Sequence, residues 1–560
     1  MTVETTGRPH EWSFVLCDSL EKVYPDAAPR QWSRELPLSV ALGETASFQL
    51  AYRPPVSPAF RDPSPLHLTV EGPSADLVTV HRVELVPCVL PAFPGHDSGY
   101  DRDAPGLFPD LLAPLDDGNL WPMFGSWRAV WFDMTSDDEA RTGIHTVAVV
   151  VRDGAGRELY RDDVTVTVLP LRLPELDIVN SHWLHADAIA DHYRVPVFSE
   201  EHWELLERFV ASASGMGVNS LLAPVWTPPL DTGIGHYRTP VQLVDVEDTG
   251  DGTFRFGFER LARWLDLCRR NGIRGVEVAH LFTQWGAAFT PAVYARRDGE
   301  TVRLFGWDVA ATDPRYRTFL EQLLPQLLEV LDEHADIDRV VFHISDEPHG
   351  DEQLANYLAA KDVVADLLVG RRIVDALSDF AYYESGAVPV PVVATDAITP
   401  FLDNRPDELW AYYCVSQDRD VANRFFALPS ARNRVIGHQL FRFGIQGFLH
   451  WGFNFYYSWH SLRLIDPFRD TTAGGAFPGG DPFVVYPGEH GHPLPSIRYR
   501  VFAQAMADHR AMQALRERDG VEAVTQLIDP DGTLRFDRFP ADPVHYLSVR
   551  EAINARLVRD

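Results

Sequence analysis

The sequence predicts a multidomain protein: an N-terminal all-β sandwich, an α/β domain of the (β/α)8 TIM-barrel type, and a short C-terminal extension. The chain has 560 residues, more than one hydrophobic core usually organises. Residues 12–169 contain short runs of alternating apolar and polar residues separated by Pro, Gly and Asp, which is typical of a β-sandwich. Beyond residue 175, apolar strand-like runs alternate with amphipathic helical patterns, which is typical of a parallel barrel. We assign residues 1–173 to the sandwich, 174–515 to the barrel and 516–560 to the extension.

The sandwich strands are predicted from period-two alternation between turn-forming residues. The clearest are Ala46–Tyr52, Leu66–Val70, Ser126–Met134, His145–Val151 and Val164–Leu169. The segment Leu169–Pro174 then carries two prolines, which predicts a stiff connector between the domains.

The barrel strands are predicted from eight apolar runs. They are Ile178–Trp183, Asn219–Pro224, Val276–Leu281, Val340–Ile344, Arg372–Leu377, Pro391–Thr395, Leu409–Cys414 and Gly447–Trp451. Helical patterns lie between most of them, at Glu200–Met216, Phe258–Asn271, Pro314–His334, Asp351–Leu368 and Ser430–Phe443. Between the sixth and seventh strands, Ile398–Glu408 shows little helical pattern.

The end of the chain is predicted to close the barrel. Asp466–Pro495 is rich in Gly, Pro and Asp, which predicts a long loop over the barrel mouth. Pro495–Leu515 has the pattern of a closing helix. In the extension we expect a hairpin with strands Val524–Ile528 and Thr533–Phe536, and a final helix over Val549–Val558.

Composition restricts the classes of partner. The net charge of −30 disfavours nucleic acid and anionic membrane surfaces, and it favours a small neutral or cationic substrate. The four cysteines show no metal-binding spacing, and no cofactor or metal is predicted. The first residues lack a signal-peptide pattern, and no run approaches the roughly 20 apolar residues of a membrane span, so we expect a cytoplasmic protein. A homo-oligomer is compatible with the sequence.

The segment Arg339–Gly350, RVVFHISDEPHG, is the most informative in the chain. Its apolar run predicts a buried strand that stops at Pro348, which cannot donate to a sheet and disfavours helix before it. Asp346 and Glu347 therefore lie at the C-terminal tip of a barrel strand, where such barrels carry out chemistry. The alternative is a solvated acidic turn, but the flanking strand is too apolar for an ordinary surface loop.

Residues that follow the other strands are expected to share this rim. They combine aromatic faces with many donors and acceptors, which is what a sugar ring requires. The predicted substrate-binding residues are His182, His185, Asp187, Trp226, His280, Gln284, Trp285, Asp379, Tyr412, Tyr413, His450, Trp451, Asn454 and Tyr456. Each of these aromatic residues could instead serve only packing, so the prediction depends on their convergence.

The carboxylates favour one kind of glycosidase mechanism. Conventional retaining enzymes need a nucleophile beside the acid/base, and strand seven carries no carboxylate at its C-terminal tip. Adjacent carboxylates suit substrate assistance, in which the 2-acetamido oxygen of the sugar attacks C1. Asp346 would orient the amide and stabilise the oxazolinium, and Glu347 would be the acid/base. Tyr412 or Tyr413 could donate a hydroxyl to the acetamido oxygen.

Three other interpretations are open at this stage. A glycosidase of another sugar specificity could pair Asp346 or Glu347 with Asp187, Asp379 or Asp396. A non-catalytic carbohydrate-binding protein could use the same aromatic rim. A metal-dependent hydrolase is suggested by the 21 histidines, although His182 and His185 lack the HxH spacing such sites use.

Several motifs of this sequence resemble glycoside hydrolase family 123 and its uncharacterised relatives. The resemblance covers most of residues 11–515 and implies a sandwich followed by a barrel, with exo-β-N-acetylgalactosaminidase activity by the substrate-assisted route. It also implies that Asp346 is the acetamido-stabilising aspartate and Glu347 the acid/base. The motifs are HISDEP (343–348), HLFTQWGA (280–287), LLAPVWTPPLDT (221–232), NRFFALPSARNRVIGHQL (423–440), GFLHWGFNFY (447–456), VYPG (485–488) and GETASFQL (43–50).

Overall fold

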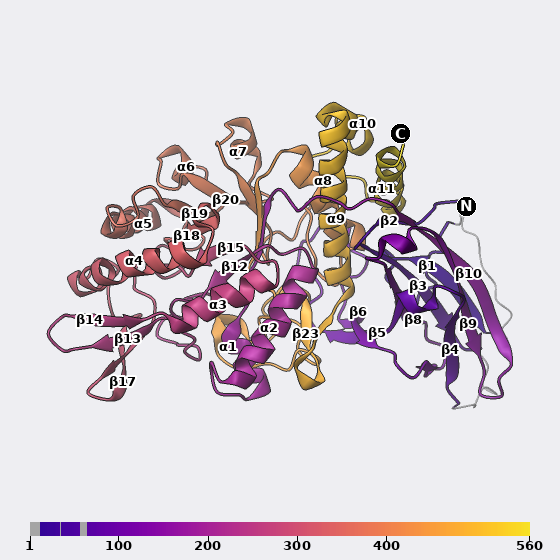
Figure 1. Ribbon diagram of the computed structural model, residues 1–560, viewed down its shortest axis with the longest axis horizontal. Helices are drawn as coiled ribbons and strands as arrows, with labels where there is room; N and C mark the ends of the chain where they lie inside the picture. The colour runs from indigo at the N-terminus through magenta and orange to yellow at the C-terminus, as the bar shows by residue number, and fades with distance from the viewer. Residues whose placement is uncertain (1–11, 34, 56–63, 560) are drawn as a thin grey trace.

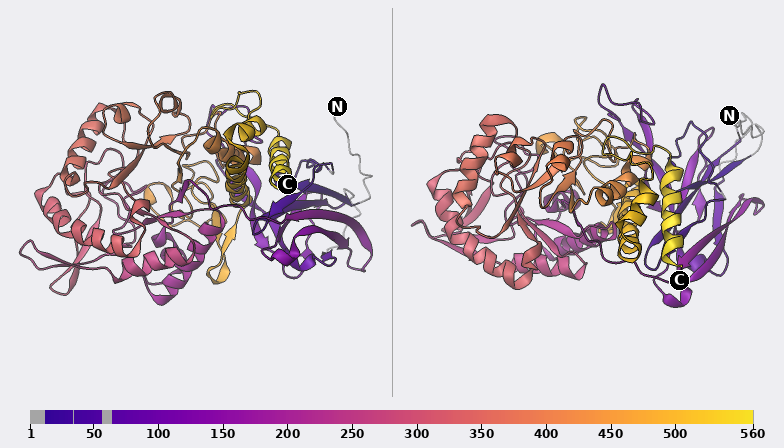
Figure 2. Two further views of the ribbon diagram at one scale, coloured as in Figure 1. Left: turned by 45° about the horizontal axis from the view of Figure 1, so that its top comes forward. Right: turned by 90° about the horizontal axis from the view of Figure 1, so that it is seen from above.

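A computed structural model describes residues 12–33, 35–55 and 64–559. Figure 1 shows the β-sandwich at one end of the molecule and the barrel at the other, and the C-terminal helices lie between them. The two further views in Figure 2 show the same arrangement. The predicted fold class, a sandwich followed by a TIM-type barrel, is confirmed.

The sandwich consists of two five-stranded sheets with the orders β1-β3-β8-β5-β6 and β2-β10-β9-β4-β7. All five strands predicted in this domain are present. In the core, the rings of Phe48 and Phe132 stack at 4.7 Å between centroids, which packs neighbouring strands of one sheet. The strands are β1 (Ser13–Asp18), β2 (Ser39–Ala41), β3 (Thr45–Arg53), β4 (Leu66–Glu71), β5 (Val78–Cys88), β6 (Gly106–Pro114), β7 (Asn119–Leu120), β8 (Arg128–Thr135), β9 (Gly143–Arg152) and β10 (Glu158–Leu169).

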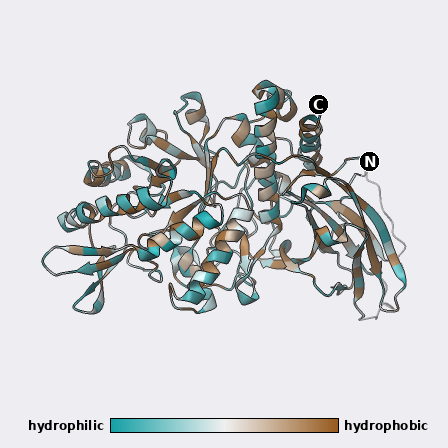
Figure 3. Cartoon of the chain, in the orientation of Figure 1, coloured by the Kyte–Doolittle hydropathy of each residue, from teal (hydrophilic) through white to brown (hydrophobic). Residues whose placement is uncertain are grey.

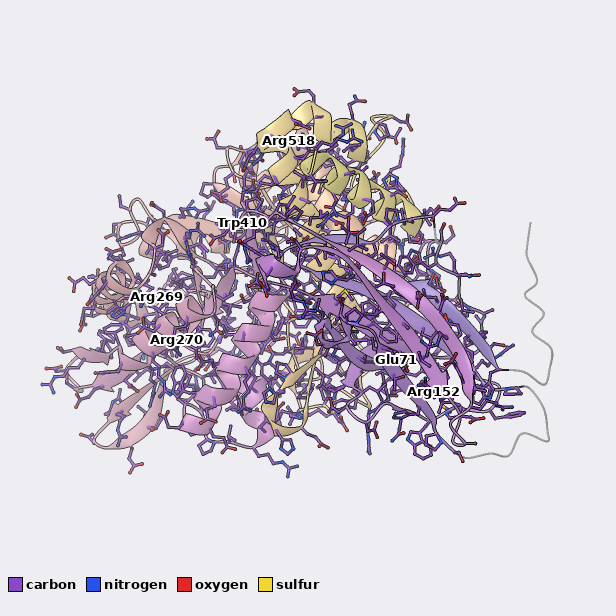
Figure 4. All side chains as sticks on the ribbon, turned by 45° about the vertical axis from the view of Figure 1, so that its right-hand side comes forward. Glu71, Arg152, Arg269, Arg270, Trp410 and Arg518 are labelled. Carbon is purple, nitrogen blue, oxygen red and sulfur yellow. The ribbon has the colours of Figure 1, made fainter. Side chains whose placement is uncertain are left out.

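Alternation along these strands separates a buried face from a solvated one. Figure 3 shows hydrophobic and hydrophilic residues alternating along the sheet ribbons. On the solvated face, Arg152 on β9 bonds Glu71 on the neighbouring β4, with 2.9 Å between Nη2 and Oε1 (Figure 4). Such exposed pairs contribute little to stability, so the sandwich depends on its apolar core.

The barrel is closed by eight parallel strands, and all eight were predicted. The connection between β20 and β21 contains only the short helix α7 (Thr399–Asp403), which agrees with the weak helical pattern there. The barrel strands are β11 (Val179–His182), β12 (Ser220–Ala223), β15 (Gly275–Val278), β18 (Val340–Phe342), β19 (Arg372–Leu377), β20 (Val390–Ala394), β21 (Trp410–Tyr412) and β22 (Gly447–His450).

The five helices predicted around the barrel are confirmed: α2 (Glu200–Gly215), α3 (Glu259–Arg270), α4 (Pro314–His334), α5 (Gly350–Val364) and α8 (Ser430–Arg442). The sequence did not reveal α1 (Ala186–Tyr193), because eight residues span little more than two turns and show the helical period only briefly. It also missed a four-stranded sheet outside the barrel. That sheet has the order β14 (Phe254–Gly257), β13 (Asp245–Asp248), β16 (Val293–Arg297) and β17 (Glu300–Phe305). No helix among the described residues is long and apolar enough to cross a bilayer.

The C-terminal extension is helical, and the predicted hairpin is wrong. Val524–Ile528 belongs to α10 (Val521–Ile528), which follows α9 (Ile497–Asp519) and precedes α11 (Pro543–Leu557). The short run VTQLI fits strand or helix equally well by pattern, and tertiary packing decides between them. Val524 and Ile528, one helical turn apart, pack in one apolar cluster with Leu515 and Ile553.

The Asp466–Pro495 segment has little regular structure, as predicted, apart from the short strands β23 (Val485–Pro487) and β24 (Pro493–Pro495). It is also held by the sandwich. Thr471 Oγ1 donates to the carbonyl of Pro87 at 2.7 Å, and the Gly479 amide donates to that of Leu90 at 2.9 Å. The segment is therefore an anchored connection between the domains.

A buried ion pair joins the domains at the same place. The Arg498 guanidinium on α9 donates to both oxygens of Asp110 on β6, at 2.8 and 2.9 Å. It also donates to the carbonyls of Gly480 and Phe483, and Tyr486 donates its hydroxyl to Asp110 at 2.6 Å. Every group of this pair has a partner, which is the condition under which a buried charge is tolerated.

We expect Arg498→Met to lower the free energy of unfolding by about 3–5 kcal/mol, because Asp110 would stay buried without its partner. Urea unfolding followed by circular dichroism measures the loss. Arg157→Met is the control, since Arg157 is 75% exposed beside Asp153 and should matter little. Adding Asp110→Asn to Arg498→Met should restore part of the stability. An unchanged urea midpoint in Arg498→Met would contradict the assignment.

Candidate active site

The turn after β18 presents Asp346 and Glu347 to the barrel mouth. Asp375 on β19 accepts a hydrogen bond from the Ile344 amide at 3.0 Å, and Glu347 donates its own amide to the Ala376 carbonyl at 3.1 Å. Glu347 has a φ of 44°, in the left-handed region that non-glycine residues seldom adopt. The neighbouring strand therefore holds the two carboxylates in a conformation that the turn alone would not favour.

A cavity of about 230 Å3 opens directly above this turn. That volume lies below the usual range for ligand pockets, and it suits one sugar ring better than a long oligosaccharide. Six of the predicted site residues line it: Gln284, Trp285, Asp346, Glu347, Tyr412 and Trp451. The remaining lining residues are Trp183, Leu230, Asp231, Ala376, Cys414, Val415, Ser416, Leu449, Trp459 and Phe477.

The two carboxylates have different surroundings. The Tyr412 hydroxyl donates to Glu347 Oε1 at 2.6 Å, whereas the Asp346 carboxylate accepts no hydrogen bond from any residue the structure describes. Burial, followed by the negative charge of Glu347, raises the pKa of Asp346 well above its usual value. The Asp346 carboxyl therefore keeps its proton to a higher pH than an exposed aspartate does.

A charged network lies beneath the pair. His343 places Nε2 at 3.2 Å from Glu277 and Nδ1 at 3.6 Å from Asp375, and all three side chains are buried. Burial alone would lower the pKa of His343, but the carboxylates of Asp375 and Glu277 raise it to about 9. The imidazolium partly offsets the rise in the pKa of Asp346. Glu277 also accepts the indole N–H of Trp183 at 3.0 Å, which fixes one wall of the cavity.

A second part of the cavity wall, formed by Trp451 and Phe477, depends on the Asp466–Pro495 segment. Trp451 donates its indole N–H to Asp481 at 3.0 Å, and Phe477 of the same segment lines the cavity. Burial raises the pKa of Asp481 to about 7. The segment therefore sets the orientation of an aromatic wall.

Asp231 is a cavity residue that the sequence prediction missed. It follows β12 on the loop from which only Trp226 was chosen. Its amide donates to the Gln284 side chain, and its carbonyl accepts the hydroxyl of Ser461 at 2.7 Å. Desolvation raises the pKa of Asp231 to about 7. One sequence feature could have identified Asp231: it is a single carboxylate at the end of a proline-rich loop that follows a barrel strand.

Ten predicted site residues do not line the cavity, which corrects the expectation that they face it. Tyr413 is buried and donates to Asn433 at 3.3 Å, while its neighbour Tyr412 points inward. Trp226 donates its indole N–H to the His280 carbonyl at 2.9 Å, behind the cavity wall. Neighbouring residues at a strand end point to opposite faces, and the sequence does not show which face is inward. The ten are His182, His185, Asp187, Trp226, His280, Asp379, Tyr413, His450, Asn454 and Tyr456.

The alternative nucleophiles considered from the sequence also lie outside the cavity. Asp187 is buried in an ion pair with Arg238, with 2.6 Å between Oδ2 and Nε. Asp379 accepts the amide of Ala381 at the start of α6 (Ala381–Glu384), and Asp396 accepts from Gln417 at 3.0 Å. Across the described residues, no group of three or more His, Cys, Asp or Glu side chains is arranged to hold a metal ion.

Comparison with protein families gives one match, to the family model described as "Glycoside hydrolase 123, catalytic domain", over residues 183–515. This range contains every residue that lines the cavity. A comparison with curated proteins finds no match.

One solved structure has the same architecture along nearly the whole chain. The chain is similar to a family 123 glycoside hydrolase from Clostridium perfringens, whose structure was analysed for glycolipid glycan hydrolysis. That likeness has a TM-score of 0.72 and 14% identity, and it covers 98% of this chain and 97% of the other. A β-D-glucuronidase from Dictyoglomus thermophilum follows, with a TM-score of 0.33, 9% identity and coverage of 90% and 99%. At 14% identity the likeness to the first structure shows the fold alone.

Proposed function

The chain belongs to glycoside hydrolase family 123, and from this premise we propose that it removes a terminal N-acetyl-β-galactosaminyl residue with retention of configuration. The observation that carries the proposal is the adjacent pair Asp346–Glu347 on the floor of a cavity sized for one sugar ring. The cavity-lining residue of strand seven is Tyr412, so the conventional nucleophile position on that strand holds no carboxylate.

The pair supports a two-step reaction. In the first step the acetamido oxygen attacks C1, while Glu347 protonates the departing glycosidic oxygen and an oxazoline forms. In the second step Glu347 deprotonates a water molecule, which attacks C1. This attack opens the oxazoline ring and restores the acetamido group. Asp346 accepts the acetamide N–H and stabilises the positive charge that develops on the oxazolinium.

Asp346 has to be ionised for its part in this reaction, although burial raises its pKa in the free protein. An acetamide N–H that donates to Asp346 favours its ionised form. Glu347 supplies the proton that the leaving oxygen requires. Tyr412 already donates to Glu347 Oε1 at 2.6 Å, which leaves the other carboxyl oxygen to carry that proton.

The aromatic side chains support sugar binding. Trp183 is buried and Trp451 is half-buried, and each donates its indole N–H to a carboxylate, whereas Trp285 and Trp459 stay 37% and 49% exposed. Buried indoles suit the apolar face of a terminal sugar, and exposed ones suit the group attached to it.

A panel of aryl glycosides tests the proposed function. We expect turnover of 2-acetamido-β-glycosides, no turnover of the matching 2-hydroxy sugars, and inhibition by a thiazoline analogue of the oxazoline. The rate should also fall as the acetyl group gains fluorine atoms, because its carbonyl oxygen becomes a weaker nucleophile. Efficient hydrolysis of a 2-hydroxy glycoside would refute substrate assistance.

A further inference from the structure

Asp231 places a third carboxylate in the cavity, and the proposed mechanism gives it no role. It lines the cavity together with Asp346 and Glu347. Gln284 and Ser461 hold its main chain from two other loops, and its φ is 40°. Aspartate adopts this left-handed region more readily than most residues, so its position in the cavity is fixed by these two main-chain hydrogen bonds.

The Asp231 side chain is half-buried, and the groups that interact with its carboxyl are the charge of Arg238 and the backbone at His460 and Ser461. Its Oδ2 is buried and has no hydrogen-bond partner within the described parts of the chain. Arg238 is the nearby cation, but its guanidinium donates to Asp187 at 2.6 and 2.7 Å. The backbone at His460 and Ser461 lowers the pKa of Asp231 less than burial raises it. Oδ2 itself is closed to a ligand, but Asp231 as a whole is only half-buried and lines the cavity, so its carboxyl can accept a ligand hydroxyl on the cavity side.

The charges of the cavity define what such a ligand can be. Three carboxylates line it, and none of the lining residues is Lys, Arg or His. Carboxylates accept hydrogen bonds from hydroxyl groups and repel anions. The aromatic walls add flat apolar faces for a ring.

We propose that Asp231 accepts hydrogen bonds from hydroxyls of the terminal sugar, and that through it the cavity selects a neutral sugar over one that carries a sulfate or carboxylate. The proposal rests on the function proposed above and deepens it. It makes Asp231 a specificity-determining residue, while the reaction at C1 remains with Asp346 and Glu347.

The test removes single hydroxyl groups from the substrate and, separately, the Asp231 carboxylate from the protein. It then asks whether the two changes affect the same interaction. Wild type, Asp231→Asn and Asp231→Ala are assayed on an aryl 2-acetamido-β-galactoside, its 3-, 4- and 6-deoxy analogues and its 6-sulfate. The assay is run at pH 8, so that Asp231, with a pKa of about 7, is mostly ionised. Asp298→Asn is the control, because Asp298 also has a positive φ (53°) but lies exposed in the β16–β17 turn.

We expect kcat/KM of the wild type to fall on the order of 10- to 100-fold for at least one deoxy analogue, as for a lost hydrogen bond to a charged group. Asp231→Ala should lose a similar factor on the parent substrate and show little further loss on that analogue. The wild type should reject the 6-sulfate, and Asp231→Asn should reject it less strongly. The control should match the wild type.

The proposal is overturned if each deoxy analogue lowers kcat/KM by the same factor in the wild type and in Asp231→Ala. It is also overturned if the wild type hydrolyses the 6-sulfate as fast as the unmodified substrate. If Asp231→Ala loses turnover and azide restores it, Asp231 is a nucleophile and the proposal is wrong. If the wild type cleaves only 2-hydroxy glycosides, the proposed function fails. The same comparison with deoxy analogues of that sugar then still decides the role of Asp231.

Discussion

Replacing Glu347 by glutamine is expected to lower kcat by about 10²- to 10⁴-fold on substrates with poor leaving groups, the usual contribution of a general acid. The amide keeps the size of the side chain and can still meet the Tyr412 hydroxyl, which lies 2.6 Å from Oε1, but it cannot release a proton. Steady-state kinetics with aryl glycosides of graded leaving-group pKa measures the effect. The loss should be smallest for the most acidic phenol, because that phenol leaves without protonation.

The matched control is Glu352→Gln, which makes the same change on the exposed surface of α5. Its kinetics should equal those of the wild type. Added azide should raise turnover of the most acidic phenol glycoside by Glu347→Gln, because azide attacks the oxazoline without a general base. An equal loss for all leaving groups would assign Glu347 a role other than proton transfer.

Replacing Asp346 by asparagine is the second large effect we expect, a loss of about 10²- to 10³-fold in kcat, typical of removing one electrostatic contact to a developing charge. The neutral amide would no longer stabilise the oxazolinium or fix the acetamide N–H. KM should change less than kcat, since the contact strengthens only as charge develops. Kinetics on the 2-acetamido substrate and its trifluoroacetamido analogue measure the loss.

Asp351→Asn, an exposed change at the start of α5, is the control for Asp346→Asn. The trifluoroacetyl group withdraws charge from the oxazolinium, so the wild type should lose more rate on that substrate than Asp346→Asn does. A variant as active as the wild type would show that Asp346 does not face the acetamido group during the reaction.

The sequence predicted the barrel because local patterns determine it. The run around Val340–Phe342 is apolar throughout, as is common in a strand with both faces covered. The other seven strands also contain apolar residues, although polar side chains interrupt several of them, such as Glu277 in β15. The extension shows the limit of this argument. Val524 and Ile528 fit a strand or a helix, and only their contacts with Leu515 and Ile553 select the helix.

The candidate site was predictable only in part from position at the ends of the strands. Asp346, Glu347, Trp285 and Tyr412 all line the cavity, and Tyr413 does not, because one step along a strand turns the side chain to the other face. Asp231 was missed because a long loop returns it to the cavity, and no local pattern encodes that path.

The network beneath the site left one signal in the sequence that was not used. Glu277 interrupts the apolar strand β15, GVEV, and is fully buried. A buried carboxylate requires partners on neighbouring elements, so its presence predicts a polar cluster inside the barrel. Its partners are Trp183, Ser220 and His343, which come from three other strands or strand ends.

The anchoring of the Asp466–Pro495 segment has a consequence for how this protein can be divided or recombined. One aromatic wall of the cavity is oriented by Asp481, and the segment that carries it is fastened to carbonyls of Pro87 and Leu90. A gene fragment limited to the barrel would therefore encode the catalytic carboxylates without the template that shapes the wall beside them. A barrel grafted onto a foreign sandwich would also lack the carbonyls that hold this segment. We therefore expect the two domains to keep a correctly shaped cavity only when they are transferred together.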